Sequence, residues 1–237
     1  MSENQATDHR YYGRRKGKPL KAGRERLLDT LLPKLRIAPP TAPPPESLDP
    51  RSLFAHAPRE VWLEIGFGSG EHLAGQAEAH PAVGFIGAEV FLNGVASLLR
   101  HVDERSLANV RIHDNDVRPL LTHFPASSLN RISLLFPDPW PKNRHAKRRF
   151  VGPRNLDEVA RLLADGGEFR VATDHPVYAR WTLQHVPQHP DFEWRVQGPD
   201  DWRVRPADST PSRYEQKAVA AGRTPMFLRF FRRNRPR

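Results

Sequence analysis

The sequence predicts an α/β fold with a doubly wound parallel sheet. From residue 59 onward, short apolar runs alternate with stretches of helical periodicity, which is the pattern of strands joined by crossover helices. A glycine-rich turn follows the first run, and an acidic residue stands at or near the end of each of the first five. Right-handed crossovers place helices on both faces of such a sheet. Since ligands bind beyond the carboxyl ends of parallel strands, we expect a ligand site at that edge.

The elements follow one another in a regular order. VWLEI at 61–65 is the first strand candidate and leads through the turn into a helical stretch. Leucines at helical spacing in 23–36 predict a short helix packed on the main domain. The helical stretch 154–167 ends in two glycines, which are typical helix terminators. The predicted strands are 61–65, 83–90, 110–116, 131–136, 168–174, 192–196 and 226–231, and the predicted helices are 23–36, 71–80, 92–105, 117–124, 154–167 and 175–186.

Composition limits the class of protein. The chain has 237 residues, of which 38% are hydrophobic, enough for one core but below the usual globular share. Its net charge of +10 favours a polyanionic partner, and nucleic acid fits better than a membrane because no apolar run is long enough to cross a bilayer. The N-terminus lacks a secretory signal, there are no cysteines, and no histidine pair has metal-ligand spacing. We therefore expect a cytoplasmic protein without a metal.

Composition also divides the chain into three parts. Residues 1–22 are rich in arginine and lysine and predict a flexible basic arm, which either contacts RNA or only adds solubility. Residues 23–50 combine the leucine-rich helix with a proline-rich linker. The alternating strands and helices in 51–237 predict a single catalytic domain.

The residues around the glycine-rich turn indicate a cationic ligand. Glycines at alternate positions permit a tight turn and a close approach of a ligand to the backbone. Their GxGxG spacing departs from the GxGxxG fingerprint of dinucleotide sites, and Glu64 just before the turn would repel a diphosphate. S-adenosylmethionine, with its sulfonium and amino group, fits better. We expect Glu64 or the loop backbone at its methionine end, Glu89 at the ribose diol and Asp116 at the adenine edge.

The segment 136–150, FPDPWPKNRHAKRRF, places one carboxylate beside a run of cations. The two prolines that flank Asp138 restrict the backbone and hold it at the end of a strand. Trp140 either stacks on a base or closes the core beside the sheet, and the sequence leaves both open. The cations predict contacts with RNA phosphates, with a solvated basic loop as the alternative. The predicted phosphate contacts are Arg144, Lys147, Arg148 and Arg149.

Several motifs together resemble one family. EIGFGSG, GAEV, NDV, the segment 136–150, ATD and SRYEQKAVAAGR are similar to the motifs of the bacterial tRNA (guanine-N7)-methyltransferases, over residues 59–231. The resemblance implies a class I methyltransferase fold with a mostly parallel seven-stranded sheet. It also implies S-adenosylmethionine as the methyl donor, and N7 of a tRNA guanine as the acceptor, usually at position 46 of the variable loop.

The resemblance assigns the site residues. It implies Asp138 as the catalytic residue. The family's substrate motif is commonly Thr-x-Phe/Tyr-Glu, whereas this chain has serine at 212, which keeps the hydroxyl and loses the methyl group. The implied donor-binding residues are Glu64, Glu89, Asp116 and Asp138, joined by Gly66, Gly68 and Gly70 of the turn, and the implied substrate-binding residues are Lys142, Asp174, Ser212, Arg213, Tyr214 and Glu215.

Other functions stay open at this point. A methyltransferase acting on ribosomal RNA or protein is opposed by the specificity of the 136–150 motif. A non-catalytic RNA-binding subunit with the same fold is opposed by the retained acids, and a dinucleotide oxidoreductase by the glycine spacing. Taken singly, Asp116 and Asp174 read as helix caps or solvated loop residues. The sequence does not decide between a monomer and a homodimer.

Overall fold

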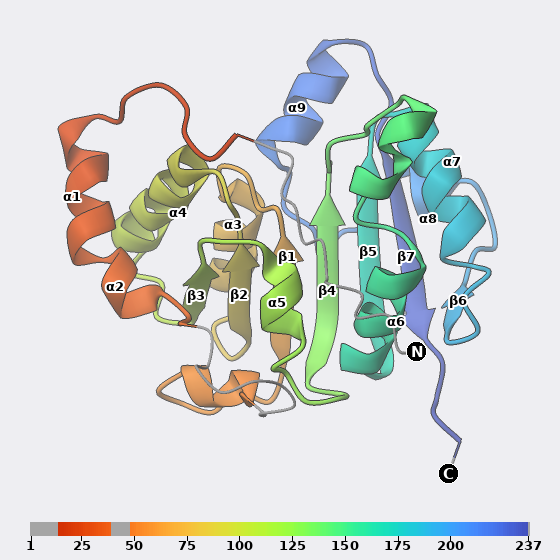
Figure 1. Ribbon diagram of the computed structural model, residues 1–237, viewed down its shortest axis with the longest axis horizontal. Coiled ribbons are helices and arrows are strands. Elements are labelled where there is room, and N and C mark those ends of the chain that lie inside the picture. The colour runs from red at the N-terminus through yellow and green to blue at the C-terminus, as the bar shows by residue number, and fades with distance from the viewer. Residues whose placement is uncertain (1–13, 39–47, 237) are drawn as a thin grey trace, which may run out of the picture.

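The computed structural model describes residues 14–38 and 48–236, which are arranged as Figure 1 shows. The first part of the predicted arm and most of the predicted proline-rich linker lie outside the described residues. None of the helices in the described ranges combines the length and the apolar composition that a membrane crossing requires.

A seven-stranded sheet forms the centre of the molecule and confirms the predicted fold class. The strands run in the spatial order β3-β2-β1-β4-β5-β7-β6. β7 pairs antiparallel with both neighbours, and the other pairings are parallel. Because β1 has β2 on one side and β4 on the other, the strand order reverses at β1, and a crevice is expected at the carboxyl ends there. The strands are β1 (Val61–Ile65), β2 (Gly84–Ala88), β3 (Val110–His113), β4 (Leu129–Leu135), β5 (Leu163–Thr173), β6 (Phe192–Trp194) and β7 (Met226–Arg232).

Helices cover both faces of the sheet. In β2, Ile86 packs into one hydrophobic cluster and Phe85 into another, as the alternation of side chains along a strand requires. The first cluster includes Leu120 of α5 and Leu156 of α6, and the second includes Leu98 of α4. The helices are α1 (Ala22–Thr30), α2 (Leu32–Leu35), α3 (Glu71–Ala79), α4 (Leu92–Arg105), α5 (Val117–Leu121), α6 (Pro153–Leu162), α7 (Pro176–His185), α8 (Asp200–Arg203) and α9 (Arg213–Ala220), with short 3-10 helices η1 (Pro50–Leu53) and η2 (Asn143–Arg148).

Among the predicted helices, 71–80, 117–124 and 175–186 are one to three residues shorter in the structure, and two others differ more. The helix expected over 23–36 is divided into α1 and α2, because Pro33 lacks the amide proton that would continue the first helix. The helix expected over 154–167 ends at Leu162, and its last five residues belong to β5. Leu163 pairs with β4 before an irregularity in the register, so pairing with a distant strand overrides the helical pattern there. α8 and α9 were not predicted as helices.

Candidate active site

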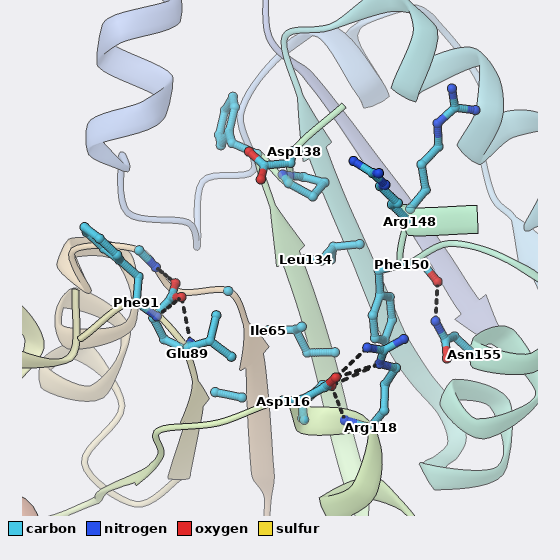
Figure 2. Close-up of a pocket in the computed structure, with 18 of the residues that line it drawn as sticks. Ile65, Glu89, Phe91, Asp116, Arg118, Leu134, Asp138, Arg148, Phe150 and Asn155 are labelled. Atoms are coloured by element: carbon cyan, nitrogen blue, oxygen red, sulfur yellow. Dashed lines mark hydrogen bonds and ion pairs between the residues drawn. The ribbon is translucent and has the colours of Figure 1, made fainter. Parts of the chain in front are cut away.

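A cavity of about 480 Å³ lies at the carboxyl ends of β1, β2 and β4. It opens at the edge where the strand pattern predicts a ligand site. Figure 2 shows carboxylates, guanidinium groups and aromatic rings that converge on it from several elements. The predicted site residues that line the cavity are Gly66, Gly68, Glu89, Asp116, Asp138, Lys147, Arg148, Arg149 and Tyr214.

The glycine-rich turn forms one wall of the cavity. Gly66 and Gly68 line it and have positive φ angles of 70° and 59°, which favour glycine. A Cβ atom on Gly68 would lie 2.5 Å from the ring of Tyr214, so a glycine is needed for the tyrosine to pack over the turn. Gly70 is instead the N-cap of α3 and is not among the lining residues.

Backbone amides hold Glu89 at the cavity. Its Oε2 accepts a hydrogen bond from the amide of Gly68 at 2.9 Å, and its Oε1 accepts from Val90 and Phe91 at 2.8 and 2.9 Å. Burial raises the pKa of this carboxyl group, the three hydrogen bonds oppose the increase, and the nearby charge of Asp138 adds to it. A carboxylate has about four lone-pair sites, so Glu89 keeps the capacity to accept hydrogen bonds from hydroxyl groups.

Asp116 both caps a helix and lines the cavity. Its Oδ1 accepts a hydrogen bond from the amide of Arg118 at 3.0 Å at the start of α5. The carboxylate also binds the guanidinium of Arg118 through two oxygens, with Nη2 at 2.5 Å from Oδ2, as the dashed lines in Figure 2 show. The ion pair fixes the carboxylate and offsets its charge.

Asp138 stands in a turn of unusual backbone conformation. Phe136 and Trp140 have positive φ angles of 50° and 42°, which residues other than glycine rarely adopt. The amide of Phe136 donates to the carbonyl of Ala172 at 2.7 Å, so β4 stays paired with β5 up to the turn. Pro137, Asp138 and Trp140 all line the cavity. Backbone conformations of this kind cluster at functional sites.

Trp140 contacts the basic run as well as the cavity. The guanidinium carbon of Arg148 lies 4.8 Å from the centroid of its ring, and His145 meets the ring edge-on at a centroid distance of 5.9 Å. The ring is partly buried and lines the cavity. Both interpretations of Trp140 therefore keep a structural basis.

Glu64 lies apart from this cavity. Its Oε2 is 2.7 Å from Nδ1 of His72, both side chains are buried, and Nε2 of His72 is 3.2 Å from Oγ of Ser209. Side chains alternate along β1, so Ile65 lines the cavity while Glu64 faces the other side of the sheet. The Glu64 carboxylate therefore does not line the cavity, whereas Gly66 and Gly68 of the turn do.

The predicted phosphate contacts differ in exposure. Arg144 and Lys147 lie exposed on η2, and Lys147 and Arg148 line the cavity. The neighbouring Lys142, predicted to bind substrate, is exposed at the N-cap of η2 and is not among the lining residues. Exposed cations beside the cavity are able to reach the phosphates of a bound nucleic acid.

Arg149 differs in its surroundings from the other predicted phosphate contacts. It is buried, and its Nε and Nη2 donate hydrogen bonds to the carbonyls of Pro139 and Trp140 at 3.2 and 2.8 Å. Its guanidinium carbon also lies 4.4 Å from the centroid of the Trp181 ring. The guanidinium therefore holds the turn around Asp138 and does not face solvent as a phosphate contact would.

The predicted substrate motif 212–215 forms the start of α9. Oγ of Ser212 accepts a hydrogen bond from the amide of Glu215 at 3.1 Å, and the Glu215 carboxylate accepts one from Nε of Arg205 at 3.0 Å. The spacing Ser-x-x-Glu is the capping-box pattern, a helix signal that the predicted elements did not include. Tyr214 lines the cavity, and burial followed by the charges of Glu89 and Asp138 raises the pKa of its hydroxyl. Arg213 is exposed.

Asp174 is engaged outside the cavity lining. It follows β5, and its Oδ2 accepts a hydrogen bond from Nε of Arg223 at 2.5 Å. Several residues that sequence reasoning missed do line the cavity. The charge of Arg14 and Arg118 could have suggested them, whereas residue type gave no signal for the other polar and aromatic lining residues, which are Phe91, Asn115, Phe136, Phe150 and Asn155.

Comparison with known proteins places the chain among methyltransferases. Residues 58–228 match a family described as putative methyltransferases. A tRNA (guanine-N(7)-)-methyltransferase of Rhodospirillum rubrum is 56% identical over 99% of this chain and 92% of its own length. One from Paramagnetospirillum magneticum is 51% identical over 95% of this chain and 94% of its own length. A solved SAM-dependent O-methyltransferase from Thermotoga maritima shares the fold with a TM-score of 0.50 at 17% identity, over 76% of this chain and 62% of that one. The chain therefore belongs to the family of tRNA (guanine-N(7)-)-methyltransferases.

Proposed function

We propose that the protein transfers a methyl group from S-adenosylmethionine to N7 of a guanine in tRNA, at position 46 of the variable loop. The observation that carries the proposal is the cavity at the strand ends, which Glu89 and Asp138 line together with the basic run. Carboxylates suit a cationic donor, and the cations suit a polyanionic substrate. The names of the relatives support tRNA and N7, and the position rests on the family resemblance. We place the enzyme in the cytoplasm, with residues 51–237 as its catalytic domain.

The cavity residues fit S-adenosylmethionine. Glu89, fixed by three amides, would accept hydrogen bonds from the ribose hydroxyls. Gly66 and Gly68 bring backbone to the cavity wall and would hold the methionine end, while the segment 115–117 would hold the adenine. When bound, the donor supplies a methyl group whose bond to sulfur breaks as a bond to nitrogen forms, with the electron pair staying on sulfur.

The acceptor chemistry explains why the cavity needs no strong base. Guanine N7 is an aromatic lone pair without a proton, so the protein has to align the base and stabilise the charge that develops on it. Asp138 would accept hydrogen bonds from the N1–H and amino groups of the guanine, and its negative charge would stabilise the cationic purine. The turn around Asp138, held by Arg149, keeps this carboxylate in place before the substrate arrives.

The cations beside the cavity would bind the RNA backbone. Lys142, Arg144, Lys147 and Arg148 would contact phosphates that flank the target nucleotide, which positions the RNA without reading its sequence. Trp140 and Tyr214 at the cavity offer aromatic surface for the base. The position of the cavity next to these groups supports a target base turned out of the RNA stack.

The test uses the full chain with unmodified tRNA and S-adenosylmethionine labelled in the methyl group. After digestion to nucleosides, we expect the label in 7-methylguanosine. A matched tRNA with adenine at position 46 should take up no label. Label in another nucleoside contradicts the proposed acceptor atom, and equal label in the matched tRNA contradicts the proposed position. No label with folded protein favours a non-catalytic RNA-binding subunit.

A further inference from the structure

The described part of the basic arm is tied to the start of α4. Oδ1 of Asn93 accepts a hydrogen bond from the amide of Gly17 at 2.8 Å, and Nδ2 of Asn93 donates one to the carbonyl of Lys18 at 2.8 Å. The amide of Leu92 donates to the carbonyl of Arg15 at 2.9 Å. In Figure 1 the red segment before α1 runs past α4 toward α9. These contacts hold the backbone of the arm, so they leave its charged side chains available.

The arm fits the start of α4 in its shape and in its hydrogen bonds. A Cβ atom on Gly17 would lie 2.8 Å from the ring of Phe91, so the arm can approach this closely because residue 17 is a glycine. Phe91 is the N-cap of α4 and provides no side-chain cap. The carbonyl of Arg15 therefore satisfies an amide that the helix itself leaves without a partner. A tail that served solubility alone would need none of this complementarity.

The docked arm brings cations to the cavity from a second direction. Arg14 lines the cavity, and Arg14, Arg15, Lys16 and Lys18 are exposed. The arm lies against residues that follow β2, whereas the basic run of η2 follows β4, and these two strands flank β1. Positive charge therefore borders the cavity on both sides of the strand that carries the glycine-rich turn.

We propose that Asn93 is a positioning residue that holds the basic arm at the rim of the cavity and places Arg14 against a phosphate of the tRNA. The inference rests on the proposed function, because it takes the tRNA as the occupant of this surface. An arm that is ordered before binding loses less conformational freedom when the RNA arrives than a free tail does. We call the contacts of Asn93 with Gly17 and Lys18 the clamp; it strengthens tRNA binding because it orders the arm before the tRNA binds.

Two variants disturb the docked arm in different ways, one by removing hydrogen bonds and one by adding a steric contact. Asn93→Ala removes both side-chain hydrogen bonds, and Gly17→Ala puts a methyl group 2.8 Å from the Phe91 ring, so that the arm or the ring has to shift. Each is expected to raise the Kd for unmodified tRNA roughly five- to tenfold and to reduce the log–log salt slope by about 0.7 for each phosphate that the arm no longer binds. The KM for tRNA should change more than kcat. Lys34→Ala, which removes an exposed cation of α2 outside the cavity lining, is the matched control and should change Kd less than about twofold.

A double-mutant cycle tests whether the clamp acts through Arg14. Arg14→Ala should raise the Kd about fivefold in the native background and less than about twofold in the Asn93→Ala background, because the released arm no longer places the guanidinium. Equal losses in both backgrounds overturn the proposal, as does a native Kd for both arm-releasing variants. Production of 7-methylguanosine by the native protein separates the two hypotheses: its absence contradicts the proposed function, whereas its presence with a failed cycle contradicts the clamp alone.

Discussion

Acids in the described part of the chain lie in two regions that differ in what faces their oxygens. At the cavity, Glu89 accepts hydrogen bonds from backbone amides and borders a space of about 480 Å³. On the face of the sheet that carries Glu64, Asp208 and Glu168 are met by Arg170 at 2.6 and 2.8 Å, beside a space of about 10 Å³. The first region can receive a ligand, and the second is already filled by its own ion pairs. The two regions therefore differ in whether a carboxylate borders an open space or is held among arginine side chains.

The ion-paired region behind the sheet supports the cavity region through residues 205–212. The carbonyl of Asp208 accepts a hydrogen bond from Nε2 of Gln76 at 2.7 Å, and the side chain of Asp208 pairs with Arg170. This segment leads directly to Ser212, the N-cap of α9, which carries Tyr214 to the cavity. The ion pairs behind the sheet thus fix the helix that covers the glycine-rich turn.

The largest expected effect is a loss of activity without a loss of stability when an acid of the cavity region is changed. Asp138→Asn keeps the size of the side chain but removes the charge that would stabilise the methylated purine, so we expect kcat to fall by roughly 10²–10³-fold. The side chain is exposed at the cavity, so the midpoint of thermal unfolding should stay near that of the native protein. Single-turnover methylation and thermal unfolding measure the two quantities. A rate within about threefold of native would remove Asp138 from the catalytic role.

The second effect concerns the pH dependence of donor binding. Because burial raises the pKa of Glu89 above its ordinary 4.5, the carboxylate should become protonated, and lose acceptor capacity, as the pH falls through a value above 4.5. The affinity for S-adenosylhomocysteine should decline in that range. Glu89→Gln replaces one carboxylate oxygen, a hydrogen-bond acceptor, by an amino group that would face backbone amides. This variant should bind S-adenosylhomocysteine roughly tenfold more weakly than the native protein at pH 7, and its affinity should no longer depend on pH in this range. Calorimetric titrations between pH 5 and pH 7.5 test both expectations. An unchanged pH profile in the variant would place the ribose elsewhere.

The third effect is on stability. Burial alone would raise the pKa of Asp208, but the hydrogen bond from Arg170 and the charges of Arg170 and Arg131 hold it at about 2, below the ordinary 3.8. A depressed pKa adds stability that is present above 3.8 and is lost as the pH falls toward 2. Because the side chain is 40% exposed, solvent screens its charge, and we expect Asp208→Asn to lower the free energy of unfolding by about 1 kcal/mol at pH 7, with the difference shrinking below pH 4. Urea unfolding measures it. A difference that stays constant with pH would contradict the ionic account.

The local sequence patterns predicted most of the helices and strands but fewer of the residues at the cavity. The helix at 92–105 has the bounds that its periodicity predicts, whereas the end of α6 depends on pairing between β4 and β5, which no local pattern contains. Of the five acids predicted at the strand ends, Glu89, Asp116 and Asp138 line the cavity, whereas Glu64 and Asp174 do not. The alternation in VWLEI could have indicated that Glu64 and Ile65 face opposite sides. The burial of Arg149 could not have been predicted, because it depends on the distant Trp181.

The smallest expected effects test whether cations, like the acids, differ between those exposed at the cavity and those held in internal contacts. Lys147 is exposed at the cavity, so Lys147→Ala should raise the Kd for tRNA about threefold and reduce the salt slope by about 0.7, with no change in stability. Arg149→Lys keeps the charge but loses the planar group that binds two carbonyls and stacks on Trp181. It should lower the free energy of unfolding by about 1 kcal/mol and leave the salt slope unchanged. Salt titrations of tRNA binding and urea unfolding, run on both variants, measure these changes. If Arg149→Lys instead keeps the native free energy of unfolding, the buried contacts of Arg149 do not stabilise the turn, and Arg149 returns to the set of phosphate contacts.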